Sequence, residues 1–247
     1  MSRLLVVQNH RGGGPGRFGD WLVADGVSLD VVRAYAGEPL PRRTEHDGVL
    51  VLGGGYLPDD DARVPWLAPT RALVAGAVER GDPVFGICLG GQLLARVAGG
   101  TVRGEHGEPE FGSTPLTLRG EAGADPLFAG LPERVTAVEH HVDAVTALPP
   151  GATWLASSER CPYQAFRVGE RAWGVQFHPE AGADRVRGWD ADRLRARGFD
   201  PAELLRRAEL DEPAAEAVWR KVARRFAAVV RAGAAGHESR GARAVSP

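Results

Sequence analysis

The 247-residue chain contains few cysteines and no long hydrophobic run. Its two cysteines, Cys88 and Cys161, are too few for a disulfide framework, and no Cys-x-x-Cys pair or cysteine–histidine cluster indicates zinc. The first apolar run, "LLVV" at residues 4–7, is too short for the core of a signal peptide or for a membrane span. We therefore expect a cytoplasmic protein with reduced thiols, no metal and no cofactor.

A strong net charge and a nucleotide-binding glycine pattern are also missing. The formal net charge is −2, with 43% hydrophobic and 25% charged residues, which gives no bulk attraction to nucleic acid or acidic membranes. No Walker-type phosphate loop is present, and the chain is too short to add a synthetase domain to its one core. We therefore expect neither a nucleic-acid partner nor a membrane partner.

Short strand patterns alternate with helical patterns in the first hundred residues. The runs at residues 3–10, 46–55 and 82–87 are apolar and end at polar or glycine residues, as buried strands do. The apolar spacing over residues 66–80 predicts a helix that is closed by Gly81. This alternation predicts an α/β fold, with a largely parallel sheet covered by helices on both faces.

The helical signal fades over residues 101–176, which read as further strands and turns. Beyond Ala183 the pattern predicts two helices that are split at "LDEP", residues 210–213. The second of these helices carries an apolar stripe that would face the core. The stripe consists of Trp219, Val222, Phe226 and Val230.

These patterns divide the chain into three parts. Residues 1–183 form the α/β domain, and residues 184–233 form a C-terminal helical extension packed on it. Residues 234–247 have too little apolar surface to offset the entropy of ordering, so we expect a disordered tail.

The stretch "FGICLGGQ", residues 85–92, places Cys88 in a glycine-rich bend between a strand and a helix. Open α/β sheets bind ligands at the carboxyl ends of their strands, where Cys88 is expected. Gly86-x-Cys88-x-Gly90 has the form of a nucleophile elbow, a strained turn with no room for neighbouring β-carbons. Unpaired N–H groups at the helix start would stabilise a thiolate. Two interpretations remain open, a nucleophile or a small buried side chain.

The stretch "AWGVQFHPEAG" offers a base for such a nucleophile. An apolar strand ends at His178, and Glu180 follows two positions later. A thiol nucleophile needs an imidazole to carry its proton and a carboxylate to orient that imidazole. The glycine run 53–55 ends another strand and could aim backbone N–H groups at an oxyanion, although a tight turn alone would look the same. Together, the three stretches favour a cysteine-nucleophile enzyme.

Taken in chain order, the glycine run 53–55, the stretch 85–92 and the stretch 172–182 resemble class I (triad-type) glutamine amidotransferases. The resemblance covers roughly residues 45–182. The resemblance is closest to the glutaminase part of guanosine monophosphate synthetase and its stand-alone relatives. It extends to "EFG" at 110–112 and to residues 141–166. It implies a three-layer, flavodoxin-like fold. It also implies a catalytic triad of Cys88 as nucleophile, His178 as general acid and base, and Glu180 as orienting carboxylate.

The resemblance also assigns the groups around the triad. The oxyanion hole would use the backbone N–H groups of Gly54 and Leu89. The glutamine-binding positions fall on Gln92, Tyr56 and the backbone of Val142 and Asp143. The second cysteine, Cys161, has no catalytic role in the resemblance, and we expect it to be structural.

Two positions depart from the residues that the family usually carries. Gly55 stands in place of a proline, which gives the oxyanion loop more conformational freedom. Val142 stands in place of the glycine in the usual "HGD", so that a side chain enters beside the substrate. The identity of the substrate, glutamine or another γ-glutamyl compound, therefore stays open.

The resemblance implies a glutaminase subunit that hydrolyses the side-chain amide of glutamine through a cysteine thioester. Its ammonia would serve a separate synthetase, because this chain has no synthetase domain. One alternative is a hydrolase of γ-glutamyl amides or peptides, and another is a non-catalytic regulatory module of the same fold. Product assays separate the first two functions, and a glutamine-mimicking electrophile that labels Cys88 separates the third.

Overall fold

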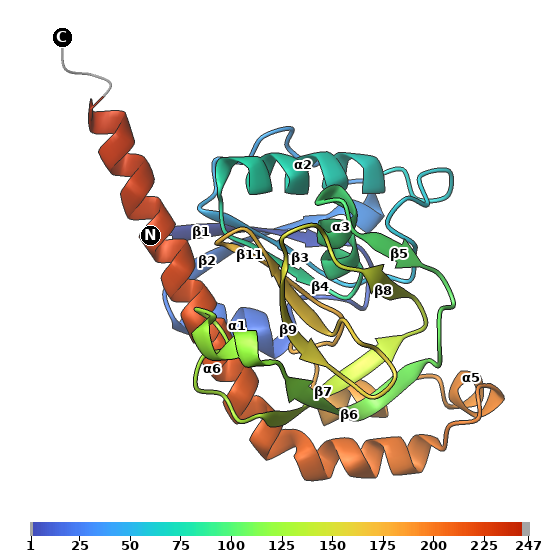
Figure 1. Cartoon of the computed structure of the whole chain (residues 1–247). Coiled ribbons are helices and arrows are strands. Elements are labelled where there is room, and N and C mark those ends of the chain that lie inside the picture. Colours follow the sequence, from blue (N-terminus) through green and yellow to red (C-terminus); the bar gives the residue numbers. More distant parts are fainter. Residues whose placement is uncertain (1, 244–247) are drawn as a thin grey trace.

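The computed structural model describes residues 2–243, with side chains through residue 233, and is built on a nine-stranded sheet (Figure 1). The strand order is β2-β1-β3-β4-β11-β10-β9-β6-β7, and β5 and β8 form a separate two-stranded sheet. The strands span Ser2–Gln8 (β1), Val27–Arg33 (β2), Gly48–Val51 (β3), Val84–Ile87 (β4), Thr101–Arg103 (β5), Glu110–Leu118 (β6), Arg134–His141 (β7), Ala144–Ala147 (β8), Thr153–Ser157 (β9), Ala165–Val168 (β10) and Ala172–Val175 (β11).

One half of the large sheet is parallel and the other is antiparallel. Strands β2, β1, β3, β4 and β11 pair in parallel, and β10, β9, β6 and β7 continue the sheet with antiparallel pairings. Every residue of β3, β4 and β11 is buried, which explains why these strands read as uniform apolar runs. Because parallel strands end at the same edge, the loops after β3, β4 and β11 are neighbours.

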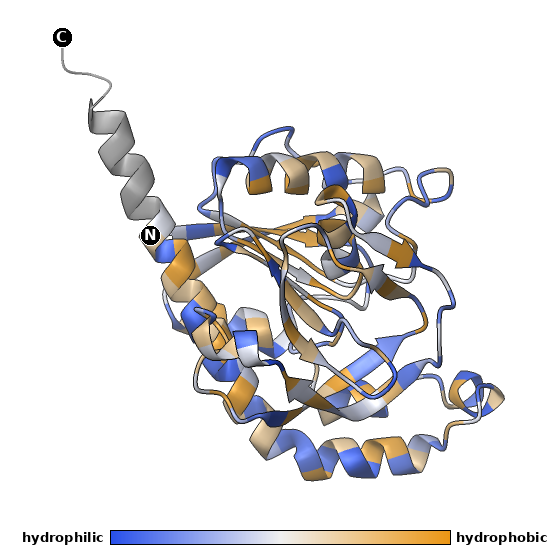
Figure 2. Ribbon diagram, viewed as in Figure 1, coloured by the Kyte–Doolittle hydropathy of each residue, from blue (hydrophilic) through white to orange (hydrophobic). Residues whose placement is uncertain are grey.

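Helices cover both faces of the sheet, as the sequence predicts. The buried side chains of α2 and α3 share one core cluster with β3 and β4, and those of α1 and α6 share the other cluster. The central strands are mainly hydrophobic (Figure 2). The helices span Gly16–Ala24 (α1), Leu67–Arg80 (α2), Leu89–Val97 (α3), Ala183–Arg187 (α4), Ala191–Ala196 (α5) and Pro201–Arg243 (α6), with 3₁₀ turns at Ala34–Ala36 (η1) and Gly120–Ala124 (η2).

The prediction of two C-terminal helices split at residues 210–213 is wrong, because α6 continues through Pro213. The helix changes direction between its orange and red parts (Figure 1). A proline inside a helix removes one backbone hydrogen bond and bends the helix, and packing on both sides can hold the bent form. Leu204 and Ala208 pack in one cluster before the proline, and Ala215 and Trp219 pack in the main core after it.

The C-terminal extension contributes directly to the core of the sheet. The rings of Trp219 and Phe177 lie 4.5 Å apart, and those of Phe226 and Phe85 lie 5.3 Å apart. Trp219 Nε1 also donates to the carbonyl of Thr136, 2.9 Å away. All four residues of the predicted stripe are fully buried.

The assigned helix α6 reaches Arg243, and thus includes the start of the segment 234–247 for which a disordered tail is predicted. The last part of that segment, residues 244–247, lies outside the described residues. Among the helices that the structure describes, none is long and apolar enough to cross a membrane.

Candidate active site

Cys88 occupies the sharp turn between β4 and α3. Its backbone has φ 51° and ψ −109°, a strained conformation for a residue with a side chain. A β-carbon on Gly86 would lie 2.4 Å from the backbone of Gly90, and one on Gly90 would lie 2.0 Å from the carbonyl oxygen of Val51. Both glycines are therefore required by close backbone contacts, as the elbow pattern predicts.

His178 and Glu180 follow β11 and lie beside this turn. The His178 N–H donates to the Val138 carbonyl on β7, at 2.8 Å. His178 Nδ1 lies 2.7 Å from Glu180 Oε1, and because a carboxylate only accepts, Nδ1 carries the proton. A β-carbon on Gly53 would lie 3.0 Å from His178 Cε1 and 3.5 Å from Cys88 Cβ, so the imidazole and the cysteine flank the same point.

The electrostatics of the site favour a protonated imidazole. Burial alone would lower the pKa of His178, but the charge of Glu180 and the Cys88 sulfur hold this pKa well above its usual value. Among the described residues, no hydrogen-bond partner satisfies the buried Nε2 of His178. This nitrogen is therefore available to exchange a proton with a substrate at the cysteine.

The two predicted oxyanion-hole groups are neighbours. Leu89 is the first residue of α3, where backbone N–H groups have no partner within the helix. A β-carbon on Gly54 would lie only 2.8 Å from Leu89 Cδ2. The fully buried Asn9 fixes the start of the glycine loop, because its Nδ2 donates to the Leu52 carbonyl at 2.8 Å. A β-carbon on Gly55 would meet no atom within 4 Å, so packing does not require a glycine at this position.

Cys88 opens onto two adjoining cavities of about 400 Å³ and about 690 Å³. The smaller cavity is lined by the predicted residues Gln92, Val142 and Asp143 and also by Gly54. The larger cavity is lined by His178, Glu180 and Gly54 and also by Gly12 and Gly13. Gly12 and Gly13, which are not among the predicted site residues, therefore border the site.

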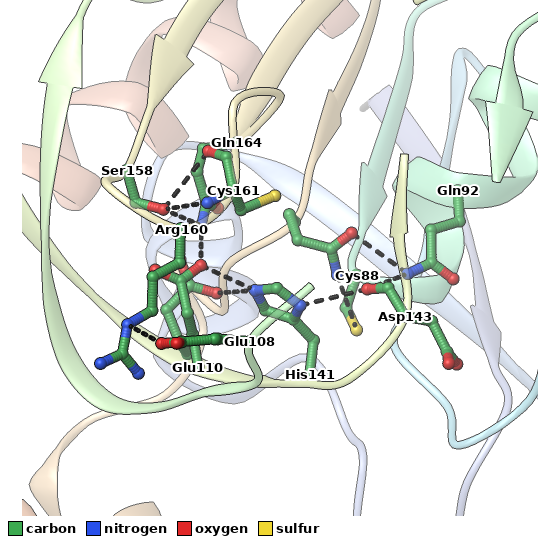
Figure 3. Close-up of polar contacts among 12 residues, drawn as sticks. Cys88, Gln92, Glu108, Glu110, His141, Asp143, Ser158, Arg160, Cys161 and Gln164 are labelled. Atoms are coloured by element: carbon green, nitrogen blue, oxygen red, sulfur yellow. Dashed lines mark hydrogen bonds and ion pairs between the residues drawn. The ribbon is translucent and has the colours of Figure 1, made fainter. Parts of the chain in front are cut away.

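A chain of hydrogen bonds connects the cysteine to the predicted substrate-binding residues (Figure 3). Gln176 Nε2 donates to Cys88 Sγ at 3.6 Å, and its Oε1 accepts from Gln92 Nε2 at 3.1 Å. Gln92 Nε2 also donates to the Asp143 carbonyl at 3.2 Å. Both protons of the Gln92 amide are thus engaged, which leaves its carbonyl oxygen for a ligand. Gln176 is missing from the predicted site, although a buried amide between apolar strand residues is a signal that could have identified it.

The remaining predicted substrate positions differ in their placement. The Val142 carbonyl accepts the N–H of His106 at 3.1 Å, and Asp143 Oδ1 accepts the N–H of Glu105 at 2.9 Å, which holds this loop against its neighbour. Tyr56 packs edge-on against the ring of Trp66 and lines neither cavity. The structure therefore brings Val142 and Asp143 to the cysteine, but not Tyr56.

A buried polar cluster contacts this loop through His141 (Figure 3). The ligand atoms of Glu110, His141 and Cys161 lie within 4.8 Å of one another, a group that could hold a metal ion. In this structure His141 Nε2 instead contacts Glu110 Oε2 at 3.0 Å, and Nδ1 contacts the Asp143 carbonyl at 3.1 Å. Burial raises the pKa of the Cys161 thiol, which keeps it protonated and unreactive.

Glu139 lies in the same region, and its protonation gives a testable prediction. The side chain is fully buried, neither carboxyl oxygen has a hydrogen-bond partner among the described residues, and His141 Nε2 is 3.5 Å away. Burial, followed by the charge of Glu110, raises the pKa of Glu139 well above its usual value. Above that usual value the unfolded chain binds fewer protons than the folded one, so stability falls as the pH rises.

We expect Glu139→Gln to remove the fall in stability with rising pH, because glutamine has the shape of the neutral acid and does not ionise. The stability gained over the natural protein should grow with pH, by up to about 1.4 kcal/mol per pH unit until the folded carboxyl ionises. Urea denaturation at about pH 5 and about pH 8 measures the difference. The exposed Glu133→Gln is the control. A constant difference at both pH values would contradict the prediction.

Part of the cavity wall comes from the C-terminal extension, which the sequence did not place at the site. Residues 188–190, Arg193 and Leu194 line the smaller cavity, together with Arg197. The ring of Trp189 lies 4.7 Å from that of His140. Burial, with a contribution from the charge of His178, lowers the pKa of His140 to about 4, so this ring is neutral at pH 7.

A strained cysteine at a strand end, beside a histidine–glutamate pair, defines a cysteine-nucleophile enzyme site on an α/β sheet. Residues 20–186 match the family Glutamine amidotransferase class-I. Because the match covers more than half of the chain, the chain belongs to this family.

Solved structures and curated proteins agree with this assignment. A glutamine amidotransferase from Thermotoga maritima is 29% identical, with a TM-score of 0.82, over 92% of this chain and 98% of that one. A glutamine amidotransferase from Methylobacillus flagellatus is also 29% identical, with a TM-score of 0.78, over 94% and 95%. The glutamine-hydrolysing GMP synthase of Streptococcus equi is 42% identical over 105 residues, 41% of this chain and 20% of the synthase. The match thus spans about a fifth of that relative's length.

Proposed function

We propose that the chain is a glutaminase that hydrolyses the side-chain amide of glutamine to glutamate and ammonia. The observation that carries this proposal is the placement of His178, whose Nδ1 is held by Glu180 at 2.7 Å while its free Nε2 lies beside the Cys88 turn. This arrangement gives a thiolate and an imidazolium the geometry to act on one bound amide.

The first half of the reaction forms a covalent intermediate. The Cys88 thiolate attacks the amide carbon, and the N–H groups of Gly54 and Leu89 stabilise the resulting oxyanion. His178 Nε2 gives its proton to the amide nitrogen, the carbon–nitrogen bond breaks, and ammonia leaves. A γ-glutamyl thioester on Cys88 remains. One oxyanion donor typically contributes about 3 kcal/mol to lowering the barrier.

The second half returns the enzyme to its starting state. The neutral His178 Nε2 takes a proton from water, and the hydroxide attacks the thioester carbon. The carbon–sulfur bond breaks, Cys88 leaves as the thiolate, and glutamate is released. Glu180 holds the imidazole in one orientation through both steps.

We propose that a synthetase subunit receives the ammonia that the reaction releases. The glutamine-hydrolysing GMP synthases that the chain resembles support a partnership of this kind, although they match it over only about a fifth of their length.

A hydrolase of γ-glutamyl amides or peptides is the second candidate. The observation that favours it is Val142, which lines the smaller cavity at a position where the family usually has glycine. Ammonia release from glutamine, compared with amine release from γ-glutamyl anilide, distinguishes the two functions. We expect ammonia release from glutamine, with the larger kcat/KM. Preference for the anilide would favour the second candidate.

The reactivity of Cys88 distinguishes an enzyme from a non-catalytic module of the same fold. Cys88 of a catalytic protein should be labelled by 6-diazo-5-oxo-L-norleucine, an electrophile that mimics glutamine. Labelling is followed by mass spectrometry of the intact protein and of the peptide that contains Cys88. Absence of labelling, in a protein whose Cys88 still reacts with iodoacetamide, would support the module.

A further inference from the structure

The arginines in and next to α5 fall into two groups. Two of them are paired away from the site, Arg195 with Asp192 at 2.9 Å and Arg187 with Glu209 at 2.6 Å. Arg193 instead lines both cavities, and it has no ion-pair or side-chain hydrogen-bond partner among the described residues. Arg197 lines the smaller cavity and is likewise unpaired within the part of the chain that the structure describes. Arg185, which lines the larger cavity, donates to the Gly12 carbonyl, so in the described part of the chain Arg193 and Arg197 are the unpaired arginines of the smaller cavity.

The charge of Arg193 acts inside the site. It contributes to the lowered pKa of His140, after the larger effects of burial and of His178. His140 is neutral at pH 7, and Arg193 and Arg197 bring guanidinium charge to the smaller cavity. A guanidinium in this position can bind a carboxylate through two parallel hydrogen bonds.

The same wall also offers negative charge at separate points. Asp190 Oδ1 accepts the N–H groups of Asp192 and Arg193, at 3.0 and 3.1 Å, and its other oxygen remains available. Asp143 also lines this cavity and belongs to the predicted substrate loop. A free α-amino acid carries both a carboxylate and an ammonium group, so a wall with both signs suits it.

We propose that Arg193, assisted by Arg197, binds the free α-carboxylate of the substrate and so restricts the site to unincorporated γ-glutamyl compounds. Glutamine side chains within a peptide lack this carboxylate and would be discriminated against. This inference rests on the proposed function and adds to it a recognition site on the C-terminal extension, outside the residues that the family resemblance assigns.

The α-carboxylate does not change in the reaction, so we expect a contact of the arginines with it to contribute to binding. An interaction that is equally strong in the ground state and in the transition state changes KM and leaves kcat unaltered. A hydrogen-bonded charge pair of this kind corresponds to a factor of about 10 to 100. The arginines therefore affect which substrate is bound, whereas Cys88 and His178 carry out the reaction.

The test compares two substrates in four proteins: the natural protein, Arg193→Ala, Arg193→Ala/Arg197→Ala and the control Arg195→Ala. The substrates are glutamine and its α-amide, in which the carboxylate is replaced by a neutral carboxamide. In the natural protein we expect the α-amide to have a kcat/KM about 10- to 100-fold lower. Arg193→Ala should lower kcat/KM for glutamine by a similar factor through KM, with no further loss for the α-amide. The control Arg195→Ala, on the same helix but paired with Asp192, should behave like the natural protein.

Labelling by 6-diazo-5-oxo-L-norleucine, which carries the α-carboxylate, provides a second readout that needs no turnover. Arg193→Ala should slow this labelling about 10-fold or more and leave alkylation by iodoacetamide unchanged. If the natural protein is labelled but releases no ammonia, the proposed function fails while the carboxylate site can still be judged. Equal sensitivity of the natural protein and of the Arg193→Ala/Arg197→Ala variant to loss of the carboxylate would overturn the proposal.

Discussion

Cys88→Ala is expected to abolish glutamine hydrolysis, lowering kcat by at least about 10⁴-fold. Without the sulfur no thioester can form, and His178 alone has no covalent route to the amide carbon. The side chain is small and 7% exposed, so its loss should leave the fold intact. Ammonia release measures the activity, and circular dichroism with a thermal melt checks the fold.

Cys161→Ala is the matched control for this experiment. Cys161 is also a buried cysteine, but its thiol is held protonated among Glu110 and His141 and lies in neither cavity. We expect this variant to keep its activity while losing some stability. Full activity in Cys88→Ala, or complete loss in Cys161→Ala with an intact fold, would show that the nucleophile is misassigned.

Gly90→Ala is expected to destabilise the protein by about 3 kcal/mol or more. Its new β-carbon would lie 2.0 Å from the carbonyl oxygen of Val51, which belongs to a central strand and cannot move alone. The strand or the elbow must shift, and either movement disturbs the cysteine. Urea denaturation measures the change in the free energy of unfolding.

The control for this substitution is Gly55→Ala in the neighbouring oxyanion loop. A β-carbon on Gly55 meets no atom within 4 Å, and its φ lies outside the left-handed region. Alanine there should leave stability unchanged or raise it by about 0.4–1 kcal/mol through the unfolded state. Equal stability of Gly90→Ala and Gly55→Ala would mean that the elbow is less tightly packed than its contacts indicate.

The features that the sequence predicted are those with a local cause. Gly86 and Gly90 bracket the cysteine because each touches backbone within a few residues or on the next strand, so the motif is contiguous. The apolar runs of β1, β3 and β4 are buried on both faces, which makes them readable as strands. His178 and Glu180 are two positions apart, and the predicted alignment of strand ends brought them to Cys88.

The features that the sequence did not predict depend on distant packing. Gln176 contacts the sulfur because β11 lies next to β4, and nothing in its own segment indicates which neighbour it meets. Pro213 suggested a break, but the buried residues on both sides keep one bent helix. The placement of Arg193 over the cavity depends on how the extension folds back, which helical periodicity does not encode.

The backbone conformation of Cys88 presents the sulfur for catalysis but lowers the stability of the fold. A residue with a side chain at φ 51° carries a penalty of about 1–3 kcal/mol, which glycine would largely avoid. The turn that presents the sulfur is therefore also a place where the chain would be more robust without it. Replacing residues that have unfavourable backbone angles is one way to stabilise a protein. In this chain that approach would begin with Cys88, the residue on which the chemistry depends.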